Sequence, residues 1–316
     1  MRRAHLRFLD VREASVALML VAVAVYLSFA SDYFLAPRNL LNVGRQASVV
    51  GMVALGQALV IIARGIDLSV GSVIGLSAVA GAIVARETGI DGLSLPVAAI
   101  VGLACGLFNG LLYTKLRINP FIATLGTLSI ARGIALLLTG GLPVPLAGPA
   151  EFLGAGRLGG IPVSLIIMLV LAAVFVVIAG STRFGREVFA IGDNPKASRL
   201  AGIPLDWVRL RVFAISGMLA GFGGIILAGN LASADPNLGL GYELDVIAAV
   251  ILGGTSLSGG RGSIPGVILG AVLMALLNNA FVLLGISAYW QVVTKGVVII
   301  LAVGLDSIRR DKSADD

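Results

Sequence analysis

The chain has 316 residues, of which 58% are hydrophobic and only 13% are charged. A water-soluble domain of ordinary composition has about 25% charged residues, so this chain lacks the polar side chains needed to cover a surface that faces water. Apolar runs of about 17–25 residues, the length that crosses a bilayer as a helix, recur along it. The composition therefore excludes a soluble globular protein and predicts an all-α membrane protein with many spans.

Apolar runs and helix breakers divide the chain into about ten predicted spans. In chain order they cover residues 14–30, 41–62, 66–85, 95–114, 120–139, 162–180, 212–230, 244–258, 264–285 and 290–305. The first run ends in Ser-Phe-Ala, which imitates a signal-peptidase site only weakly, so we expect it to be retained as a span. The runs at 66–85 and 244–258 allow either full spans or short, broken helices.

Lys and Arg residues are distributed asymmetrically between the two sides of these spans. With the N-terminus inside, seventeen of the 23 lie in inner segments, and only Arg38, Arg86 and Arg157 lie in outer loops. Because cytoplasmic loops retain positive charge, we predict an even number of spans with both termini in the cytoplasm. The same asymmetry explains the net charge of +6, so no nucleic-acid partner is expected.

Glycines recur one helical turn apart in several predicted spans, a spacing that lets helix backbones approach closely in lipid. The sets are Gly71 with Gly75, Gly102 with Gly106 and Gly110, Gly217 with Gly221, and Gly266 with Gly270. They predict a compact bundle. In addition, "GIDLSVG" (65–71) is echoed by "GTSLSGG" (254–260), each at the cytoplasmic end of an apolar run. The sequence alone leaves open whether this echo is a true repeat.

The longest polar stretch of the chain lies in a predicted cytoplasmic loop, residues 181–211. Asn194 suits an N-cap, Pro195 the first helical position and Gly202 a left-handed C′ residue, so a helix of about two turns is predicted between them. A helix this short is not stable alone in water. Either it packs on a partner protein, or the segment is a solvated positive-inside loop. Its apolar residues are Ala197, Leu200 and Ala201, and its basic residues are Lys196 and Arg199.

Five stretches together carry a family resemblance that covers nearly the whole chain from about residue 40. They are "GIDLSVGSVIGLSA" (65–78), "LRINPFIATLGTLSIARGIALLLTGG" (116–141), "GREVFAIGDNPKASRLAGI" (185–203), "GYELDVIAAVILGGTSLSGGRGSIPGVILGA" (241–271) and "LLNNAFVLLGISAYWQVVTKGVVIILAV" (276–303). They resemble the permease subunits of bacterial ABC importers of monosaccharides, the ribose permease group. The resemblance implies one integral membrane domain over residues 1–316, folded as a type II ABC importer-like bundle in the bacterial cytoplasmic (inner) membrane.

The resemblance also implies partners: a second permease copy in a homodimer, ATP-hydrolysing ABC subunits, and an extracytoplasmic sugar-binding protein. Loop 181–211 is implied to be the coupling loop to the ATPase, through Gly185, Arg186, Asn194, Pro195, Lys196, Ala197, Arg199, Leu200 and Gly202.

The sequence contains neither of two common catalytic motifs, the ATP-binding phosphate loop and the zinc-protease motif. The phosphate-binding pattern G-x-x-x-x-G-K-[ST] does not occur, because "GGTSLSGGRGS" (253–263) has the glycines without the lysine. H-E-x-x-H does not occur either, and the one histidine, His5, lies in the basic N-terminal tail. We therefore expect no catalytic residue, cofactor or metal site, and a permease rather than an enzyme.

Polar residues inside the predicted spans are mostly uncharged, which suits an uncharged polyhydroxyl solute better than a charged one. Our candidates for the substrate pathway are Gln57, Asn109, Thr124, Thr127, Asn278 and Asn279. Alternatively, these side chains bridge helices. Asn278 and Asn279 point about 100° apart on a helix, so the pair could serve a helix contact and the cavity at once. The predicted function is import of a neutral monosaccharide such as ribose, another pentose, a hexose or a polyol. Relatives for branched-chain amino acids or nucleosides are the alternative.

An ion-coupled secondary sugar transporter is the main alternative mechanism, since such carriers place ionisable residues inside the membrane. Arg132 and Lys295 lie within predicted spans, but no carboxylate pair is obvious. Asp67 fits a helix cap that is followed by Ser69 and paired with Arg64. We therefore favour ATP-driven import.

Overall fold

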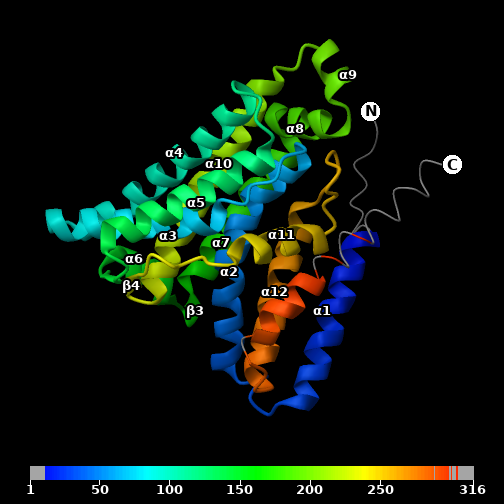
Figure 1. Cartoon of the computed structure of the whole chain (residues 1–316). Coiled ribbons are helices and arrows are strands. Elements are labelled where there is room, and N and C mark those ends of the chain that lie inside the picture. The colour runs from blue at the N-terminus through cyan, green and yellow to red at the C-terminus, as the bar shows by residue number, and fades with distance from the viewer. Residues whose placement is uncertain (1–10, 288, 299, 301–303, 305–316) are drawn as a thin grey trace.

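The computed structural model describes residues 11–287, 289–298, 300 and 304, and this part of the chain is mostly helical (Figure 1). The helices are α1 (Val11–Ala30), α2 (Pro37–Ile62), α3 (Val70–Thr88), η1 (Asp91–Leu93), α4 (Ser94–Thr114), α5 (Pro120–Thr139), α6 (Pro149–Ala155), α7 (Val163–Ser181), α8 (Arg183–Asp193), α9 (Pro195–Leu200), α10 (Leu205–Asn230), α11 (Tyr242–Leu252) and α12 (Ile264–Leu283). The strands are β1 (Val144–Pro145), β2 (Arg157–Leu158), β3 (Ile161–Pro162) and β4 (Ser233–Ala234).

Eight of the described helices are long and apolar enough to cross a membrane: α1, α2, α3, α4 with η1, α5, α7, α10 and α12. This result confirms the prediction of an all-α, multi-pass membrane protein.

The segment predicted as a span at 244–258 is not one long helix. α11 has 11 residues, and at 1.5 Å per residue it is too short to cross a hydrocarbon core of about 30 Å. The run at 66–85, which could also have been a short or broken helix, forms the 19-residue helix α3. The last predicted span, 290–305, is helical over 289–298, and most of its remainder lies outside the described residues.

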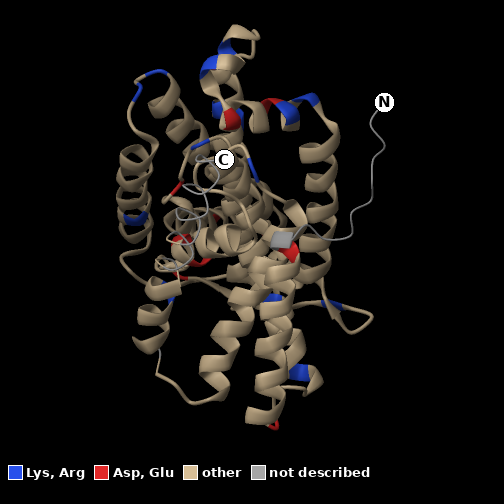
Figure 2. Ribbon diagram, turned by 90° about the vertical axis from the view of Figure 1, so that its right-hand side faces the viewer, with Lys and Arg blue, Asp and Glu red and all other residues tan. Residues whose placement is uncertain are grey.

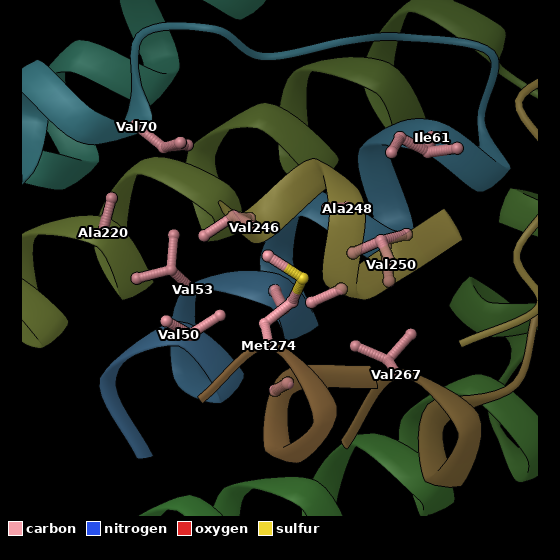
Figure 3. Packing of buried hydrophobic residues seen from close by; sticks show 14 of the residues in the cluster. Val50, Val53, Ile61, Val70, Ala220, Val246, Ala248, Val250, Val267 and Met274 are labelled. Atoms are coloured by element: carbon pink, nitrogen blue, oxygen red, sulfur yellow. The ribbon is translucent and has the colours of Figure 1, made fainter. Parts of the chain in front are cut away.

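α2 is the central helix of the bundle, and every one of its residues from Ala47 to Ile62 is buried. It packs against α7, α10, α11 and α12. Val50 and Val53 of α2 meet Val246 of α11 and Met274 of α12 in the largest apolar cluster (Figure 3). Lipid is as apolar as these side chains, so close packing is what stabilises the contacts.

Glycines bring α4 and α10 into backbone contact, as their spacing predicts. A Cβ atom added to Gly102 would collide with the Gly217 carbonyl, and a Cβ added to Gly217 would collide with the Gly102 carbonyl. Gly106 lies in the same way against the carbonyl of Phe213. The prediction of tight helix packing is therefore confirmed for this pair.

The two ends of the bundle differ in charge and in secondary structure. Lys and Arg residues are found in α8 and α9 and near the turn between α4 and α5 (Figure 2). The short strands lie outside this basic region. β1 pairs with β4, and β2 pairs with β3 in a hairpin. This distribution agrees with a cytoplasmic position for α8 and α9, although the orientation itself remains a prediction.

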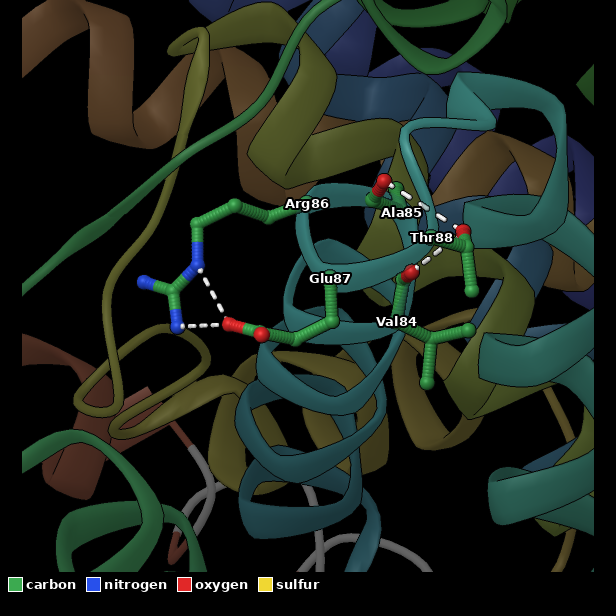
Figure 4. Close-up of polar contacts among 5 residues, drawn as sticks. All are labelled: Val84, Ala85, Arg86, Glu87 and Thr88. Carbon is green, nitrogen blue, oxygen red and sulfur yellow. Dashed lines mark hydrogen bonds and ion pairs between the residues drawn. The ribbon is translucent and has the colours of Figure 1, made fainter.

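The end of α3 carries an exposed polar group that belongs to a predicted outer loop. Arg86 pairs with Glu87 at 2.8 Å, and the Thr88 hydroxyl donates to the Val84 carbonyl at 2.7 Å (Figure 4). Exposed ion pairs of this kind contribute at most about 1 kcal/mol, so we assign this one no functional role.

Candidate functional site

α9 is a short helix with both ends capped as the sequence predicts. The Asn194 side chain accepts a hydrogen bond from the Ala197 amide at 3.0 Å. Gly202 has a φ of 79°, and its amide donates to the Arg199 carbonyl at 3.1 Å. A glycine in this left-handed C′ position ends the helix without strain, which confirms the predicted caps.

α8 is a helix that the sequence analysis missed, because residues 181–211 were predicted to be a loop with a single short helix. The Thr182 hydroxyl caps it by accepting a hydrogen bond from the Gly185 amide at 3.1 Å. Val188 and Ile191, three positions apart, are both fully buried. This spacing and the threonine before it were signals of an amphipathic helix. The polar stretch is therefore a hairpin of two helices, α8 and α9, and not a single helix with a loop before it.

The outward face of α9 is open in the single chain. Leu200 is 90% exposed, and Lys196, Ala197 and Arg199 are exposed beside it. A groove of about 360 Å³ lies between α9 and the start of α10, lined by Pro195, Lys196, Arg199, Leu200, Leu205 and Arg209. Since so short a helix is marginal on its own, this combination of leucine and basic side chains suits a partner with an apolar groove and carboxylates.

A larger cavity of about 780 Å³ opens beside the hairpin, between the ends of α4, α5 and α10. Its charged lining residues are Arg64, Arg117, Arg199, Asp206 and Arg209. The Arg209 guanidinium lies over the Tyr113 ring, 4.8 Å from its centre. Four arginines against one aspartate give the cavity a positive potential that favours anionic groups.

A buried polar network centres on Asp67, in the linker between α2 and α3. One carboxylate oxygen of Asp67 accepts from the Ser69 amide at 3.0 Å and from the Ser69 hydroxyl at 2.6 Å. The other accepts from the Ser216 hydroxyl of α10 at 3.3 Å. Asn109 of α4 donates to the Ser69 hydroxyl at 2.9 Å. The carboxylate thus satisfies donors from two helices and from its own linker.

The predicted cap function of Asp67 is confirmed in part: its carboxylate accepts from the Ser69 amide, but Ser69 itself occupies the N-cap position of α3. The predicted pairing of Asp67 with Arg64 is wrong. Asp67 is 1% exposed and bonds to Ser69, as expected. The Arg64 side chain instead donates to the carbonyls of Gly192 and Asp193 at the end of α8. A local capping rule finds the first contact, whereas the second depends on how distant segments pack.

Four of the six predicted pathway residues converge on this same network. The Thr127 hydroxyl donates to the Asn109 side chain at 2.5 Å, and the Thr124 hydroxyl contacts the Ile66 carbonyl at 3.3 Å. The Gln57 amide, in the orientation that satisfies both of its polar atoms, bonds to the backbone of Asp67. These side chains are buried and bridge helices in this arrangement, and a role in the pathway stays a prediction.

The other two predicted pathway residues, Asn278 and Asn279, lie together on α12 but contact different neighbours. Asn279 and Asn39 of α2 exchange amide hydrogen bonds at 2.8 and 3.1 Å. Asn278 instead lies near the carboxylate of Asp245 of α11. The expectation that the adjacent amides point in different directions is confirmed.

Asp245 also belongs to an ion pair that the sequence analysis missed. The Lys295 ammonium lies 2.8 Å from the Asp245 carboxylate, and the Asp245 side chain is only 4% exposed. The pair joins the helical residues 289–298 to α11. No local pattern announces it, because the two residues lie 50 positions apart in apolar surroundings.

Arg132 of α5 holds the non-helical segment between β4 and α11. Its guanidinium donates to the carbonyls of Pro236, Leu238 and Gly71, the last two at 3.0 and 3.3 Å. The segment runs against the first turns of α3, where Gly75 leaves room for it. Irregular backbone inside a membrane protein needs such internal donors, so Arg132 has a structural reason to lie in a span.

A family described as the permease component of the branched-chain amino acid transport system matches residues 39–303. The chain is 43% identical to the ribose import permease protein of Bacillus subtilis (strain 168), over 93% of this chain and 92% of that relative. It is 40% identical to the ribose import permease protein of Escherichia coli (strain K12), over 93% of each chain. It is 37% identical to the galactose/methyl galactoside import permease protein of the same strain, over 94% and 95%. No solved structure gives a significant match. Because the family match covers most of the chain and the identities extend over nearly all of it, this multi-pass membrane protein belongs to that family of transport permease components.

Proposed function

We propose that this chain is the permease subunit of an ATP-binding-cassette importer that carries a neutral monosaccharide, ribose or a related pentose, hexose or polyol, into the bacterial cytoplasm. A separate ATPase supplies the energy, and an extracytoplasmic sugar-binding protein delivers the solute to a permease homodimer. The observation that carries the proposal is the 37–43% identity, over nearly full length, to permeases named for ribose and galactose import.

The α8–α9 hairpin is the docking surface for the ATPase in this proposal. Leu200 enters an apolar groove of the partner, and Lys196 and Arg199 meet its carboxylates. α8 anchors the hairpin, because Val188 and Ile191 are buried in the cluster formed with α2 and α10. A push on α9 therefore reaches the membrane helices through a packed contact and not through a loose loop.

The substrate pathway in this proposal uses the neutral side chains that the network brings together. Thr127 hydrogen-bonds to Asn109, Asn109 to Ser69, and Gln57 to the backbone of Asp67. Amides and hydroxyls can exchange these partners for sugar hydroxyls, since both offer donors and acceptors. Such an exchange needs the helices to separate, which is the step that the ATPase drives.

The proposal is tested by reconstituting the permease in proteoliposomes with the ATPase and the sugar-binding protein of the proposed importer. We expect uptake of labelled ribose or galactose that requires ATP inside, binding protein outside, and no ion gradient. Uptake of leucine in place of sugar would instead support the alternative suggested by the description of the family. Uptake without the ATPase, driven by a proton gradient, would point to a secondary carrier and sink the proposal.

A further inference from the structure

Arg64 holds a backbone conformation that glycine usually occupies. Its φ is 65° at the end of α2, and the Gly65 amide donates to the Val60 carbonyl at 2.8 Å, as in a Schellman motif. α11 ends with the same hydrogen bonds, and there Gly254, with a φ of 87°, occupies the matching position. A left-handed conformation is disfavoured for a residue with a side chain, and such residues concentrate at functional positions. At the end of α2, an arginine therefore occupies the position that a glycine occupies at the end of α11.

The Arg64 side chain bridges α2 to the end of α8. Its Nε donates to the Gly192 carbonyl at 2.6 Å, and its Nη2 donates to the Asp193 carbonyl at 2.8 Å. A cation at the carbonyl end of a helix also interacts favourably with the helix dipole. The next residue, Asn194, caps α9, so the two carbonyls lie directly before α9 in the chain.

Around this bridge, three segments meet backbone to backbone. The Gly260 amide donates to the Ile62 carbonyl at 2.9 Å. A Cβ atom on Gly192 would collide with both groups, so no side chain separates the end of α2, the end of α8 and the loop after α11. The two echoed stretches, 65–71 and 254–260, both reach this junction. Contacts without intervening side chains transmit displacement directly.

On its other side, Arg64 continues into the linker that carries the buried network. Asp67 lies three residues on, is 1% exposed, and accepts hydrogen bonds from the linker and from α10. Asn109 ties α4 to the same linker through Ser69. Arg64 is therefore the residue between the hairpin and the network.

We propose that Arg64 is the positioning residue that transmits movement of the α8–α9 hairpin to linker 63–69 and, through Asp67, to α4 and α10. The inference rests on the proposed function, because an ATPase must move α9. A planar guanidinium that binds two carbonyls resists rotation better than a single contact does. A shift of α8 therefore displaces the backbone of Arg64, and the displaced linker changes the hydrogen bonds of the network.

The test uses variants that separate the side chain from the backbone conformation. Arg64→Gly and Arg64→Asn both tolerate a positive φ and both remove the guanidinium. Arg64→Lys keeps the charge but reaches one carbonyl at most. The matched control is Arg117→Gly, because Arg117 also has a positive φ of 55° and lines the same basic cavity. Its guanidinium makes no hydrogen bond within the residues that the structure describes.

The main measurement is the number of sugar molecules taken up per ATP hydrolysed, in proteoliposomes that hold permease, ATPase and binding protein. We expect Arg64→Gly and Arg64→Asn to assemble and to hydrolyse ATP within about two-fold of the wild type, while this ratio falls at least ten-fold. Arg64→Lys should fall between, and Arg117→Gly should keep the wild-type ratio. An unchanged ratio in Arg64→Gly would overturn the proposal, and so would loss of assembly, which would make Arg64 a structural tie only. If Arg64→Gly fails to insert in the membrane, the uptake of sugar per ATP hydrolysed is measured in Arg64→Lys instead. An unchanged value in that variant would then overturn the proposal.

A second measurement does not depend on the sugar. Spin labels are placed on the exposed positions Ile122 of α5 and Trp207 of α10 in the complex with the ATPase. Nucleotide trapping should change the distance between the labels in the wild type and in Arg117→Gly, but not in Arg64→Gly. An equal change in Arg64→Gly would contradict the role of Arg64. If the labels behave as expected but no sugar is transported, the proposed substrate fails and the role of Arg64 stands.

Discussion

Arg132 and Asp245 are ionisable residues placed among apolar helices, where an unpaired charge is expensive. Arg132 donates to three backbone carbonyls, and Asp245 pairs with Lys295 at 2.8 Å. Each therefore has a partner that accounts for its position without ion-coupled transport. At the scale of single residues, buried charge holds the irregular segment before α11 and the helical residues 289–298 in place.

The ion pair between Asp245 and Lys295 gives the first prediction at this scale. Lys295→Met should lower stability by about 3–5 kcal/mol, because it leaves a buried carboxylate without its counter-charge. The double variant Lys295→Met with Asp245→Leu should recover most of that loss, since no charge remains buried. Thermal unfolding in detergent measures both, with Lys115→Met on the exposed α4–α5 turn as the control. Equal stability of the single and double variants would show that the pair is not coupled.

Leu200 gives the second prediction at the residue scale. Leu200→Asp should abolish co-purification with the ATPase. Docking would then bury a carboxylate in an apolar groove, at a cost of roughly 4 kcal/mol. The protein should still insert, since Leu200 is 90% exposed and lies outside every span. Leu158→Asp, in the exposed β2–β3 hairpin, is the matched control. Normal sugar uptake by Leu200→Asp would mean that α9 is a solvated helix and not a docking surface.

At the scale of helices, glycine placement decides which pairs come close. α4 and α10 meet through Gly102, Gly106 and Gly217, where an added Cβ would collide with backbone of the facing helix. Gly126 on α5 has the same helical setting but no atom of another element within 4 Å of an added Cβ. Gly126 has no other glycine one helical turn away, so the packing agrees with the distinction that the spacing predicts.

The helix-scale prediction compares these two kinds of glycine. Gly102→Ala should destabilise the protein by about 1–3 kcal/mol, because α4 and α10 must move apart to admit the methyl group. Gly126→Ala should leave stability unchanged or raise it slightly, since alanine is the better helix former. Unfolding temperatures in detergent, measured side by side, check the difference. A Gly102→Ala protein as stable as Gly126→Ala would remove the argument for close packing.

At the scale of the whole molecule, the chain between α10 and α12 forms no helix long enough to cross a membrane. After α10, the backbone runs through β4, an irregular segment held by Arg132, and the 11-residue α11, before its loop reaches the end of α2 at Ile62. We infer that this broken path carries the chain across. It replaces the single helix expected at 244–258 and keeps the two sides of the protein in the predicted order.

Topology reporters test that order. Fusions after Arg12, within 190–205 and after Arg310 should report the cytoplasm, and a fusion within 146–158 should report the outer side. The reason is the excess of Lys and Arg on one side of the spans. A fusion after Ser258, beyond α11, should also report the cytoplasm if the broken segment crosses. An external signal from 190–205 would contradict the docking surface, and one after Ser258 would contradict only the broken crossing.

Features that depend on neighbouring residues could be predicted from the sequence. The length of an apolar run determines whether a helix can span, so most spans, including α3 and α12, were found. Capping is equally local, because Asn194 and Gly202 act on groups within four residues of themselves. α8 was missed although its signals were local, since residues 181–211 were predicted to be a loop with a single short helix.

Features that depend on packing were decided by the tertiary structure alone. The bond from Ser216 to Asp67 joins residues 149 positions apart, and the bond from Arg64 to Gly192 joins residues 128 apart. No periodicity or cap encodes such pairs, because they exist only once α2, α8 and α10 have met. The sequence thus determined that the chain spans a membrane and carries a capped basic helix. Packing of distant helices decided which polar residues face one another, because each buried donor must find its acceptor among whatever groups the fold brings near.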